Sequence, residues 1–415
     1  MAPPLEVRPF RIEVPQEAVD DLRARLAAAR PLPEALVDVA PWEDGTDPAY
    51  LQELLAYWRD EYDWRRWEAT LNALPQFSAA VSVGGLGADG RASDTIQLHY
   101  VHVRSERADA VPLLLLHGWP GSFFEFYKLI PLLMRDGAFH IVAPSLPGYG
   151  FSSAPTKRGF GATAIARAVD ALMAGLGYGR YIAQGGDWGA LVCRALAVNH
   201  PSSCRGIHLN MCVARPRMTN PWHLLQLANA VLAPWLPLAL SSREIKNLQD
   251  MQHFEAAETG YQKIQGTKPQ TLAYALNDSP AGLAAWIVEK FRSWSDCGGR
   301  VESAFTRDEV LTNICIYWFG GRMASNLRLY KETLSNTQEL GRMFSGYCST
   351  PTGVALFPKE LRRPPRSWAE ASYNIVQWAE PPRGGHFAAL EASSTEALAA
   401  EVAAFGALAR RKRWV

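Results

Sequence analysis

An aspartate between glycines is the first feature of the chain that could perform chemistry. Residues 185–189 read Gly-Gly-Asp-Trp-Gly, after the short apolar stretch 180–184 and before the helix-like sequence 190–197. The glycines allow a sharp turn from a strand into a helix, which presents the side chain of Asp187 at its apex. A carboxylate is a poor attacker of amides, but it can displace a leaving group from a strained or activated saturated carbon. The product would be an ester of Asp187 that water must then cleave.

Glycine-flanked aspartate also occurs in ordinary turns, because Asp and Gly tolerate the backbone conformations found there. The five residues alone leave that interpretation open. If Asp187 is a nucleophile, the substrate is an epoxide or an alkyl halide and not a peptide or a lipid ester. Other residues must then stabilise an oxyanion, activate water and protonate the leaving oxygen.

A glycine-rich loop upstream is suited to bind the oxyanion. Residues 117–121 read His-Gly-Trp-Pro-Gly and directly follow the apolar run 113–116. The N–H of Trp119 can point into the site, and the N–H of Trp188, next to Asp187, would be the second donor. We also expect both tryptophans to contact the substrate. The alternative is a glycine cluster that only forms a turn.

The base that activates water must come from nine histidines, and His386 has the best position. It lies in Gly-Gly-His-Phe at 384–387 and follows the last predicted strand, where the chain order nucleophile, acid, histidine places it. The other histidines lie in strand-like, turn or cap contexts that are typical of structural histidines. Phe387, the next residue, is a further expected contact of the substrate.

The acid that orients His386 is expected after a later strand. Glu360 follows the strand-like run 353–357 and stands at the right point in the chain. Glu380 and Glu391 are the alternatives, and a solvated surface carboxylate is the other interpretation of Glu360.

Tyrosines are suited to receive the leaving oxygen, because a phenol can hydrogen-bond an epoxide oxygen and protonate the alkoxide. Three tyrosines of the expected cap lie in polar contexts, namely Tyr261, Tyr274 and Tyr330. Spacing alone does not choose among them, and packing between cap and core would explain any one of them.

The composition excludes several other classes of function. Among 415 residues, 42 Lys and Arg stand against 41 Asp and Glu, so a net charge of +1 attracts neither nucleic acid nor an anionic membrane. The six cysteines lack the paired spacing of metal ligands and indicate thiols in a reducing compartment. The N-terminus has no signal-peptide core, and the longest apolar stretch, 228–240, is interrupted by prolines. We expect a soluble, cytoplasmic protein without membrane anchor, metal or cofactor.

Strands and helices in alternation must position these residues. Strand-like runs occur at 96–103, 113–116, 141–143, 180–184, 206–209, 353–357 and 373–378, with a loop at 84–93. Helical patterns between them, such as 162–176, predict a mostly parallel sheet with helices on both faces. Sites in such sheets lie at the carboxyl ends of the strands, where all the loops named above fall.

Two helical segments lie outside this alternation. Helical patterns at 16–29, 48–60 and 64–74 precede it, and a Trp- and Leu-rich helical segment interrupts it between about 211 and 346. We therefore divide the chain into an N-terminal extension (1–105), the first part of the core (106–210), an inserted helical cap (211–346) and the second part of the core (347–415), closed by a helix at 395–410.

With these motifs identified, the chain resembles the microsomal-type epoxide hydrolases of the α/β-hydrolase superfamily, in a soluble form. The resemblance extends over nearly the whole chain. It rests on Tyr-Asp-Trp-Arg at 62–65, the loop 117–126, the turn at Asp187, Gly-Tyr-Gln-Lys-Ile-Gln at 260–265, Thr-Lys-Pro at 267–269, Leu-Asn-Asp-Ser-Pro at 276–280 and Arg-Gly-Gly-His-Phe-Ala-Ala at 383–389.

The resemblance implies roles for individual residues: Asp187 as nucleophile, Tyr261 and Tyr330 as the epoxide-activating pair, Glu360 as the acid and His386 as the base. Tyr274 drops out. It also implies an α/β-hydrolase fold in which the N-terminal extension wraps the core and supports the cap. The membrane-anchoring N-terminal helix of the animal members is missing, which favours a cytoplasmic enzyme. A homodimer is compatible with the family, although the sequence leaves the oligomeric state open.

The expected activity is the conversion of an epoxide to a vicinal diol through an ester on Asp187. A haloalkane dehalogenase-like hydrolase is one alternative, since it shares the Asp-Trp turn and the histidine. It needs N–H donors for a halide, where this chain offers tyrosines. A binding protein that keeps the fold without turnover is the other alternative.

Overall fold

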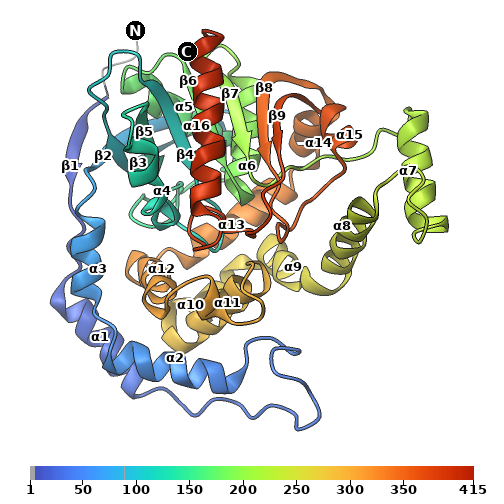
Figure 1. Ribbon diagram of the computed structural model, residues 1–415. Coiled ribbons are helices and arrows are strands. Elements are labelled where there is room, and N and C mark those ends of the chain that lie inside the picture. Colours follow the sequence, from blue (N-terminus) through green and yellow to red (C-terminus); the bar gives the residue numbers. More distant parts are fainter. Residues whose placement is uncertain (1–4, 88) are drawn as a thin grey trace.

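Nine strands form one sheet in the computed structural model, which describes residues 5–87 and 89–415 (Figure 1). The order across the sheet is β1-β2-β3-β5-β4-β6-β7-β8-β9. The pairs from β1 to β5 are antiparallel, and all pairs from β5 to β9 are parallel. The strands are β1 (Val7–Phe10), β2 (Gln76–Leu86), β3 (Ala92–Val103), β4 (Val111–Leu116), β5 (Phe139–Pro144), β6 (Tyr181–Gly185), β7 (Cys204–Leu209), β8 (Cys348–Ala355) and β9 (Tyr373–Ala379).

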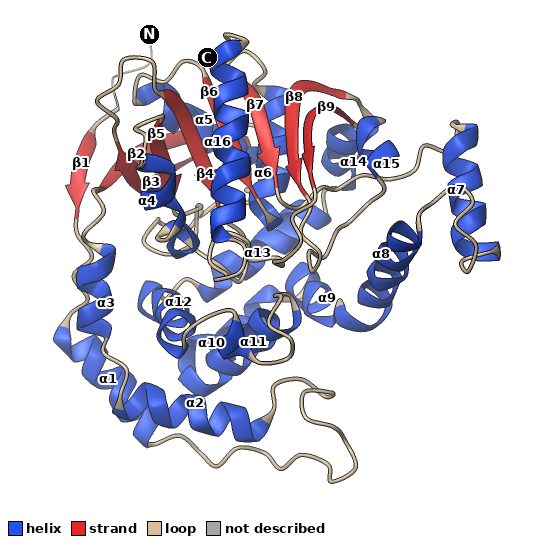
Figure 2. Cartoon of the chain, viewed as in Figure 1, coloured by secondary structure: helices blue, strands red, loops and turns tan. Residues whose placement is uncertain are grey.

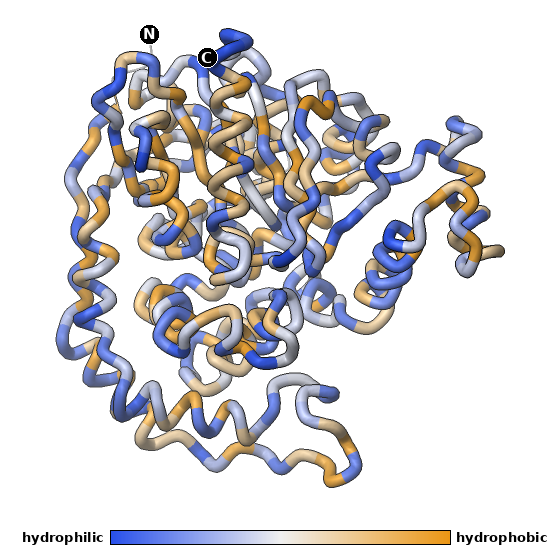
Figure 3. Tube along the Cα trace, viewed as in Figure 1, coloured by the Kyte–Doolittle hydropathy of each residue, from blue (hydrophilic) through white to orange (hydrophobic). Residues whose placement is uncertain are grey.

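The central strands are apolar because helices cover both faces of the sheet. In β4 the leucines 113–116 are fully buried, and the apolar colour of the central strands is visible in Figure 3. The predicted α/β architecture with a mostly parallel sheet is confirmed. The prediction did not include β1 and β2. The loop predicted at 84–93 is shorter in the structure, because β2 continues to Leu86 and β3 begins at Ala92. The edge strand β1 has four residues, three of them exposed, and β2 carries serines and glycines, so the apolar signal of both strands is weak.

Two pairs of helices enclose the sheet. α4 (Leu129–Met134) packs on α16 (Thr395–Arg411) at one face, and α5 (Ala162–Gly175) packs on α6 (Asp187–Asn199) at the other (Figure 2). The short elements η1 (Phe123–Phe126) and α15 (Arg366–Glu370) complete the core. No helix in the two described ranges combines the length and the apolar character needed to cross a bilayer.

The segment between β7 and β8 is helical and lies mostly below the sheet in the view of Figure 1, with α7, α8 and α14 to the side. Its elements are α7 (Pro221–Leu232), α8 (Ser242–His253), η2 (Phe254–Glu258), α9 (Gly260–Thr267), α10 (Pro269–Asp278), α11 (Pro280–Ser293), η3 (Val301–Ser303), α12 (Arg307–Gly320), α13 (Met323–Leu334) and α14 (Thr337–Ser345). Proline begins α7, α10 and α11, because its missing N–H costs nothing at a first helical position.

The N-terminal helices reach from the edge of the sheet to the inserted helices. They are α1 (Gln16–Ala27), α2 (Pro48–Asp60) and α3 (Trp64–Leu71). Asp308 of α12 accepts hydrogen bonds from the hydroxyl of Tyr57 (2.8 Å) and the indole of Trp67 (3.1 Å). The hydroxyl of Thr46 donates to the carbonyl of Ala285 in α11 at 2.7 Å. Side-chain hydrogen bonds therefore connect the N-terminal extension to α11 and α12.

A buried arginine of α6 joins the core to the end of the inserted segment. The Arg194 guanidinium is 1% exposed and donates to the carbonyls of Met343 (2.7 Å), Gly346 (2.9 Å) and Ser372 (3.3 Å). It also lies 4.3 Å from the ring centroid of Tyr373.

Arg194→Met removes these donors, leaves the buried Met343 carbonyl without this partner and loses the contact with Tyr373, so we expect the free energy of unfolding to fall by about 3 kcal/mol. Urea denaturation with an unchanged m-value measures the loss. The exposed Arg180→Met is the control and should change stability by less than about 0.5 kcal/mol. Equal stability of the two variants would contradict this account of Arg194.

Candidate active site

The turn at Asp187 has the backbone of a nucleophile-bearing elbow. β6 ends at Gly185, and α6 begins at Asp187, whose φ of +47° lies in the left-handed region that a non-glycine residue rarely adopts. Gly189 makes this tight geometry feasible, because a Cβ atom there would lie 2.0 Å from the carbonyl oxygen of Leu116 at the end of β4. The helix can thus approach the strand closely and hold the Asp187 side chain at the carboxyl ends of the strands.

His386 lies between two carboxylates. Its Nδ1 is 2.7 Å from Oε1 of Glu360, and its Nε2 is 3.3 Å from Oδ2 of Asp187. Glu360 follows β8 and His386 follows β9, and the two loops are joined by a hydrogen bond from the N–H of Lys359 to the carbonyl of Gly384. The structure therefore brings together all three residues that the sequence predicted as nucleophile, acid and base.

The charge state of His386 follows from its neighbours. Burial alone lowers the pKa of this imidazole, but the Glu360 and Asp187 carboxylates outweigh burial and raise the pKa well above its ordinary value. The resting site thus holds an imidazolium paired with two carboxylates. The hydrogen bond between Nδ1 of His386 and Glu360 fixes the orientation of the ring, so that Nε2 faces Asp187.

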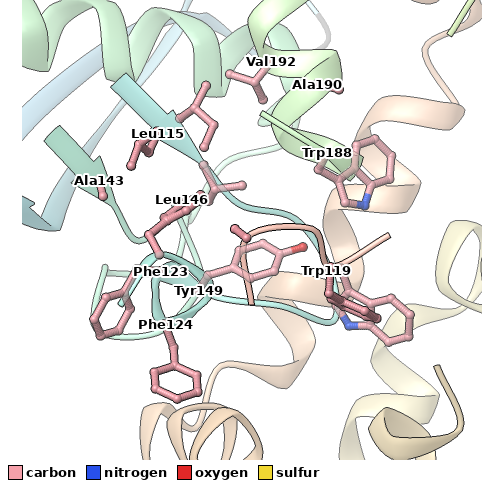
Figure 4. Packing of buried hydrophobic residues seen from close by; sticks show 14 of the residues in the cluster. Leu115, Trp119, Phe123, Phe124, Ala143, Leu146, Tyr149, Trp188, Ala190 and Val192 are labelled. Carbon is pink, nitrogen blue, oxygen red and sulfur yellow. The ribbon is translucent and has the colours of Figure 1, made fainter. Parts of the chain in front are cut away.

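The loop 117–121 covers the other side of the carboxylate. The N–H of Trp119 donates to Oδ1 of Asp187 at 2.8 Å. Gly118 is required there, since a Cβ atom would lie 2.2 Å from the same oxygen. Trp188 is the second residue of α6, where N–H groups have no acceptor within the helix. Both expected oxyanion donors are thus beside Asp187, and Figure 4 shows the two indoles on the same side of the buried core.

Two tyrosines of the inserted segment reach this loop. Tyr261 of α9 stacks on the indole of Trp119 at 5.3 Å, and Tyr330 of α13 lies edge-on to Trp188 at 4.7 Å. The two phenol rings are 5.8 Å apart, and both are buried. Burial, reinforced by the charge of Asp187, raises the pKa of each phenol, so both stay protonated and can donate. Tyr274 is 69% exposed and has no part in the site.

A pocket of about 750 Å³ opens in front of Asp187, within the range of small-molecule sites. Asp187, Trp188 and both tyrosines line it, together with apolar side chains such as Leu191. The chain enters and leaves the inserted segment along its wall, at 211–216 and at residues 334, 337, 340, 341, 344 and 345.

Several expected residues lie elsewhere. The ring of Phe387 packs on Phe291 at 4.4 Å and does not line this pocket, although Phe387 lines a smaller space behind Asp187. Among the tryptophans of the inserted segment, Trp222 and Trp235 are exposed, and the indole of Trp286 donates a hydrogen bond to Gln265.

The alternative acids have other partners. Glu391 accepts from the N–H groups of Asp296 and Phe387, and Glu380 pairs with Arg243. Within the described residues, no group of three or more His, Cys, Asp and Glu has the arrangement of a metal site.

The sequence does not distinguish two neighbours of the site from packing residues. The indole of Trp294 lies 5.2 Å from both His386 and Tyr261, and its carbonyl accepts from the N–H of His386. The buried ammonium of Lys290 lies 4.8 Å from the ring of Tyr261. Both come from α11 or its end, whose contacts with the core depend on how the inserted segment folds back.

The fold and the site define an α/β-hydrolase with a carboxylate at the elbow. Residues 111–252 match the family model of the alpha/beta hydrolase fold, and residues 7–126 match that of the epoxide hydrolase N terminus. The chain is 36% identical to Epoxide hydrolase 1 of Oryctolagus cuniculus, over 98% of this chain and 90% of the relative. The chain therefore belongs to the epoxide hydrolase family.

Solved structures agree with this assignment. The structure of Aspergillus niger epoxide hydrolase matches with a TM-score of 0.82 and 33% identity, over 97% of this chain and 96% of that one. The juvenile hormone epoxide hydrolase of the silkworm Bombyx mori matches with a TM-score of 0.85 and 32% identity, over 98% of this chain and 95% of that one. The protein is an enzyme that hydrolyses epoxides.

The raised pKa of His386 predicts a pH-dependent stability. A group whose pKa is higher in the folded than in the unfolded state contributes fully below its unfolded pKa, near 6.5, and loses this contribution as the pH rises through the folded value. The stability advantage of the wild type over His386→Asn should therefore shrink steadily as the pH is raised from about 6.5 into the alkaline range. Chemical denaturation measures it, with the exposed His253→Asn as control. An advantage that stays constant over this range would contradict the imidazolium assignment.

Proposed function

We propose that this epoxide hydrolase acts through an ester on Asp187, in two half-reactions. The observation that supports the proposal best is the placement of the carboxylate: one oxygen accepts from Trp119, and the other faces His386 at the wall of the pocket. The phenols of Tyr261 and Tyr330 line the same pocket. The nucleophile and two acids thus share one substrate-sized space, and the base lies directly behind the nucleophile.

In the first half-reaction, Oδ2 of Asp187 attacks an epoxide carbon from the side opposite to the ring oxygen. The carbon–oxygen bond of the ring breaks, and its electrons go to the oxygen. Tyr261 and Tyr330 hold that oxygen by hydrogen bonds, and one phenol gives it a proton. The result is a glycol monoester of Asp187 and a phenolate.

In the second half-reaction, His386 removes a proton from water, and the water oxygen bonds to Cγ of the ester. The N–H groups of Trp119 and Trp188 hold the negative charge that forms on Oδ1. The bond from Cγ to Oδ2 then breaks, and Oδ2, which leaves as a hydroxyl oxygen of the diol, takes the proton from His386. The second proton of the water remains on the Asp187 carboxyl and passes to His386, which restores the resting imidazolium.

The ester itself prepares His386 for this role. Asp187 loses its negative charge when it is alkylated, and that charge is one of the causes that raise the pKa of His386. With Glu360 as its only remaining carboxylate, the imidazolium gives up its proton more readily, and the phenolate left by the first half-reaction takes it through solvent. The base thus becomes available after the first half-reaction.

An alkyl halide is the alternative substrate that the nucleophile alone allows. A dehalogenase needs N–H donors that face the leaving halide, whereas the side chains that face Asp187 across the pocket include two phenols. The largely apolar wall of the pocket supports an epoxide with apolar substituents.

We assign Trp119 and Trp188, next to the nucleophile, as binding residues, and residues 211–346 as the cap that supplies the acids. The six buried, unpaired cysteines favour the cytoplasm as the location.

The ester can be trapped by removing the base. His386→Gln should alkylate Asp187 and then stall, because nothing deprotonates the water, with steady-state turnover reduced at least about 100-fold. Mass spectrometry of the intact protein and its peptides should find one substrate mass on Asp187. Asp187→Asn in the same assay should carry no adduct. An unmodified His386→Gln protein, or diol formation by Asp187→Asn at the wild-type rate, would refute the mechanism.

The phenols should act in the first half-reaction. Tyr261→Phe and Tyr330→Phe each remove one donor to the epoxide oxygen, so we expect ester formation to slow by roughly 100-fold in each variant and further in the double variant. Rapid quenching followed by mass spectrometry measures the rate. The exposed Tyr274→Phe is the matched control and should form the ester at the wild-type rate. A double variant with unchanged ester formation would exclude the phenols as acids.

A further inference from the structure

A second, much smaller cavity touches the catalytic residues. Its volume is about 10 Å³, which is the size that holds one water molecule. Asp187 and His386 line it together with Glu125, Gln184 and Asn210. Asp187 is the one residue it shares with the large pocket among those described. The cavity is therefore reached from the substrate site only past the nucleophile.

Glu125 belongs to η1, directly behind the oxyanion loop, and has no role in the mechanism described so far. Its carboxyl lies over Gly121, where a Cβ atom would be 1.6 Å from Oε1. Only glycine at position 121 leaves room for the carboxyl in this place. In the described part of the chain, Glu125 forms no ion pair with a lysine or arginine, and the positive group that acts on its carboxyl is His386.

The surroundings of Glu125 keep its carboxyl easy to protonate. Burial raises its pKa to about 8, His386 opposes this shift, and the negative charge of Asp187 adds to it. Neutral and ionised forms both offer an oxygen that accepts a hydrogen bond. The residue can therefore bind a water hydrogen on either side of neutral pH.

A second buried acceptor faces the same space. Gln184 of β6 is 1% exposed, and its Nε2 donates to Oδ1 of Asn210 at 2.8 Å. Its Oε1 is buried without a hydrogen-bond partner. A buried acceptor left alone costs about 1–3 kcal/mol, and a water in the cavity would remove that cost. A water molecule needs two to four polar partners, and Gln184, Glu125 and His386 provide them.

We propose that this cavity binds the water that cleaves the ester, and that Glu125 is a catalytic residue which orients this water. The inference rests on the proposed function and deepens its second half-reaction. One hydrogen of the water goes to Nε2 of His386, and the other is held by the Glu125 carboxyl. A lone pair of the water oxygen then points at Cγ of Asp187. Glu125 gains and loses no proton in the step, so the proton balance given above is unchanged.

The test compares ester formation with ester hydrolysis in single turnovers. Glu125→Leu keeps the bulk but removes the acceptor, so ester formation should keep its wild-type rate while hydrolysis slows by up to about 100-fold. Glu125→Gln keeps an acceptor oxygen and should restore hydrolysis to within about 10-fold of the wild type. A residue needed only for packing would show the opposite order, with Leu the better replacement.

Gly121→Ala is an independent variant. Its Cβ atom displaces the Glu125 carboxyl without removing it, so hydrolysis should again slow selectively. Glu106→Leu, which removes an exposed carboxylate, is the control. Wild-type hydrolysis by Glu125→Leu, or equal slowing of both steps, would overturn the water site. A wild-type enzyme that forms no ester on Asp187 would instead overturn the proposed function, which separates the two failures.

Discussion

Three ionisable side chains lie next to one another beneath the inserted helices, the buried Glu360 and His386 and the partly buried Asp187, and the rest of the site is arranged around their charge. An isolated charge in such a place would cost several kcal/mol, and removal of one partner from a buried pair leaves that cost uncompensated. His386 between Glu360 and Asp187 leaves one net negative charge. The N–H of Trp119 and the N-terminal end of α6, where Asp187 is the first residue, stabilise it. The same groups are in place when negative charge moves onto the ester oxygen.

This arrangement depends on backbone segments that approach one another closely. Gly189 sits against the end of β4, and Gly118 sits against the Asp187 carboxylate. A methyl group at either position would collide with the backbone or with the nucleophile. The positive φ of Asp187 stores strain of about 1–3 kcal/mol, and the packing of α6 on the sheet sustains it. Part of the packing energy of the fold therefore offsets the strain that positions the Asp187 side chain.

The sequence was sufficient for the central sheet, the place of the helices and the meeting of Asp187, Glu360 and His386. Buried parallel strands are continuous apolar runs, and the order of their loops decides which residues meet at one edge. It was insufficient where contacts depend on the path of the inserted segment. Trp294 and Lys290 reach the site from α11, and nothing in their local sequence distinguishes them from packing residues. Phe387 was misplaced for a related reason, since adjacency to His386 did not reveal which way its ring turns.

Glu125 is instructive in the same way. Glu125 lies within the loop 117–126, but a glutamate there does not by itself indicate a role. Its role is inferred from the space left by Gly121 and from Oε1 of Gln184, which has no hydrogen-bond partner.

The wall of the large pocket has a consequence for how this enzyme can diverge. Much of it is formed by the two connections between sheet and inserted helices, around 211–216 and 334–345, whereas the nucleophile and base stand on short turns fixed by the sheet. Insertions and exchanges in such connecting stretches reshape the volume offered to a molecule without moving the reacting atoms. New preferences among molecules can therefore be acquired in these two joints while the chemical apparatus is inherited unaltered.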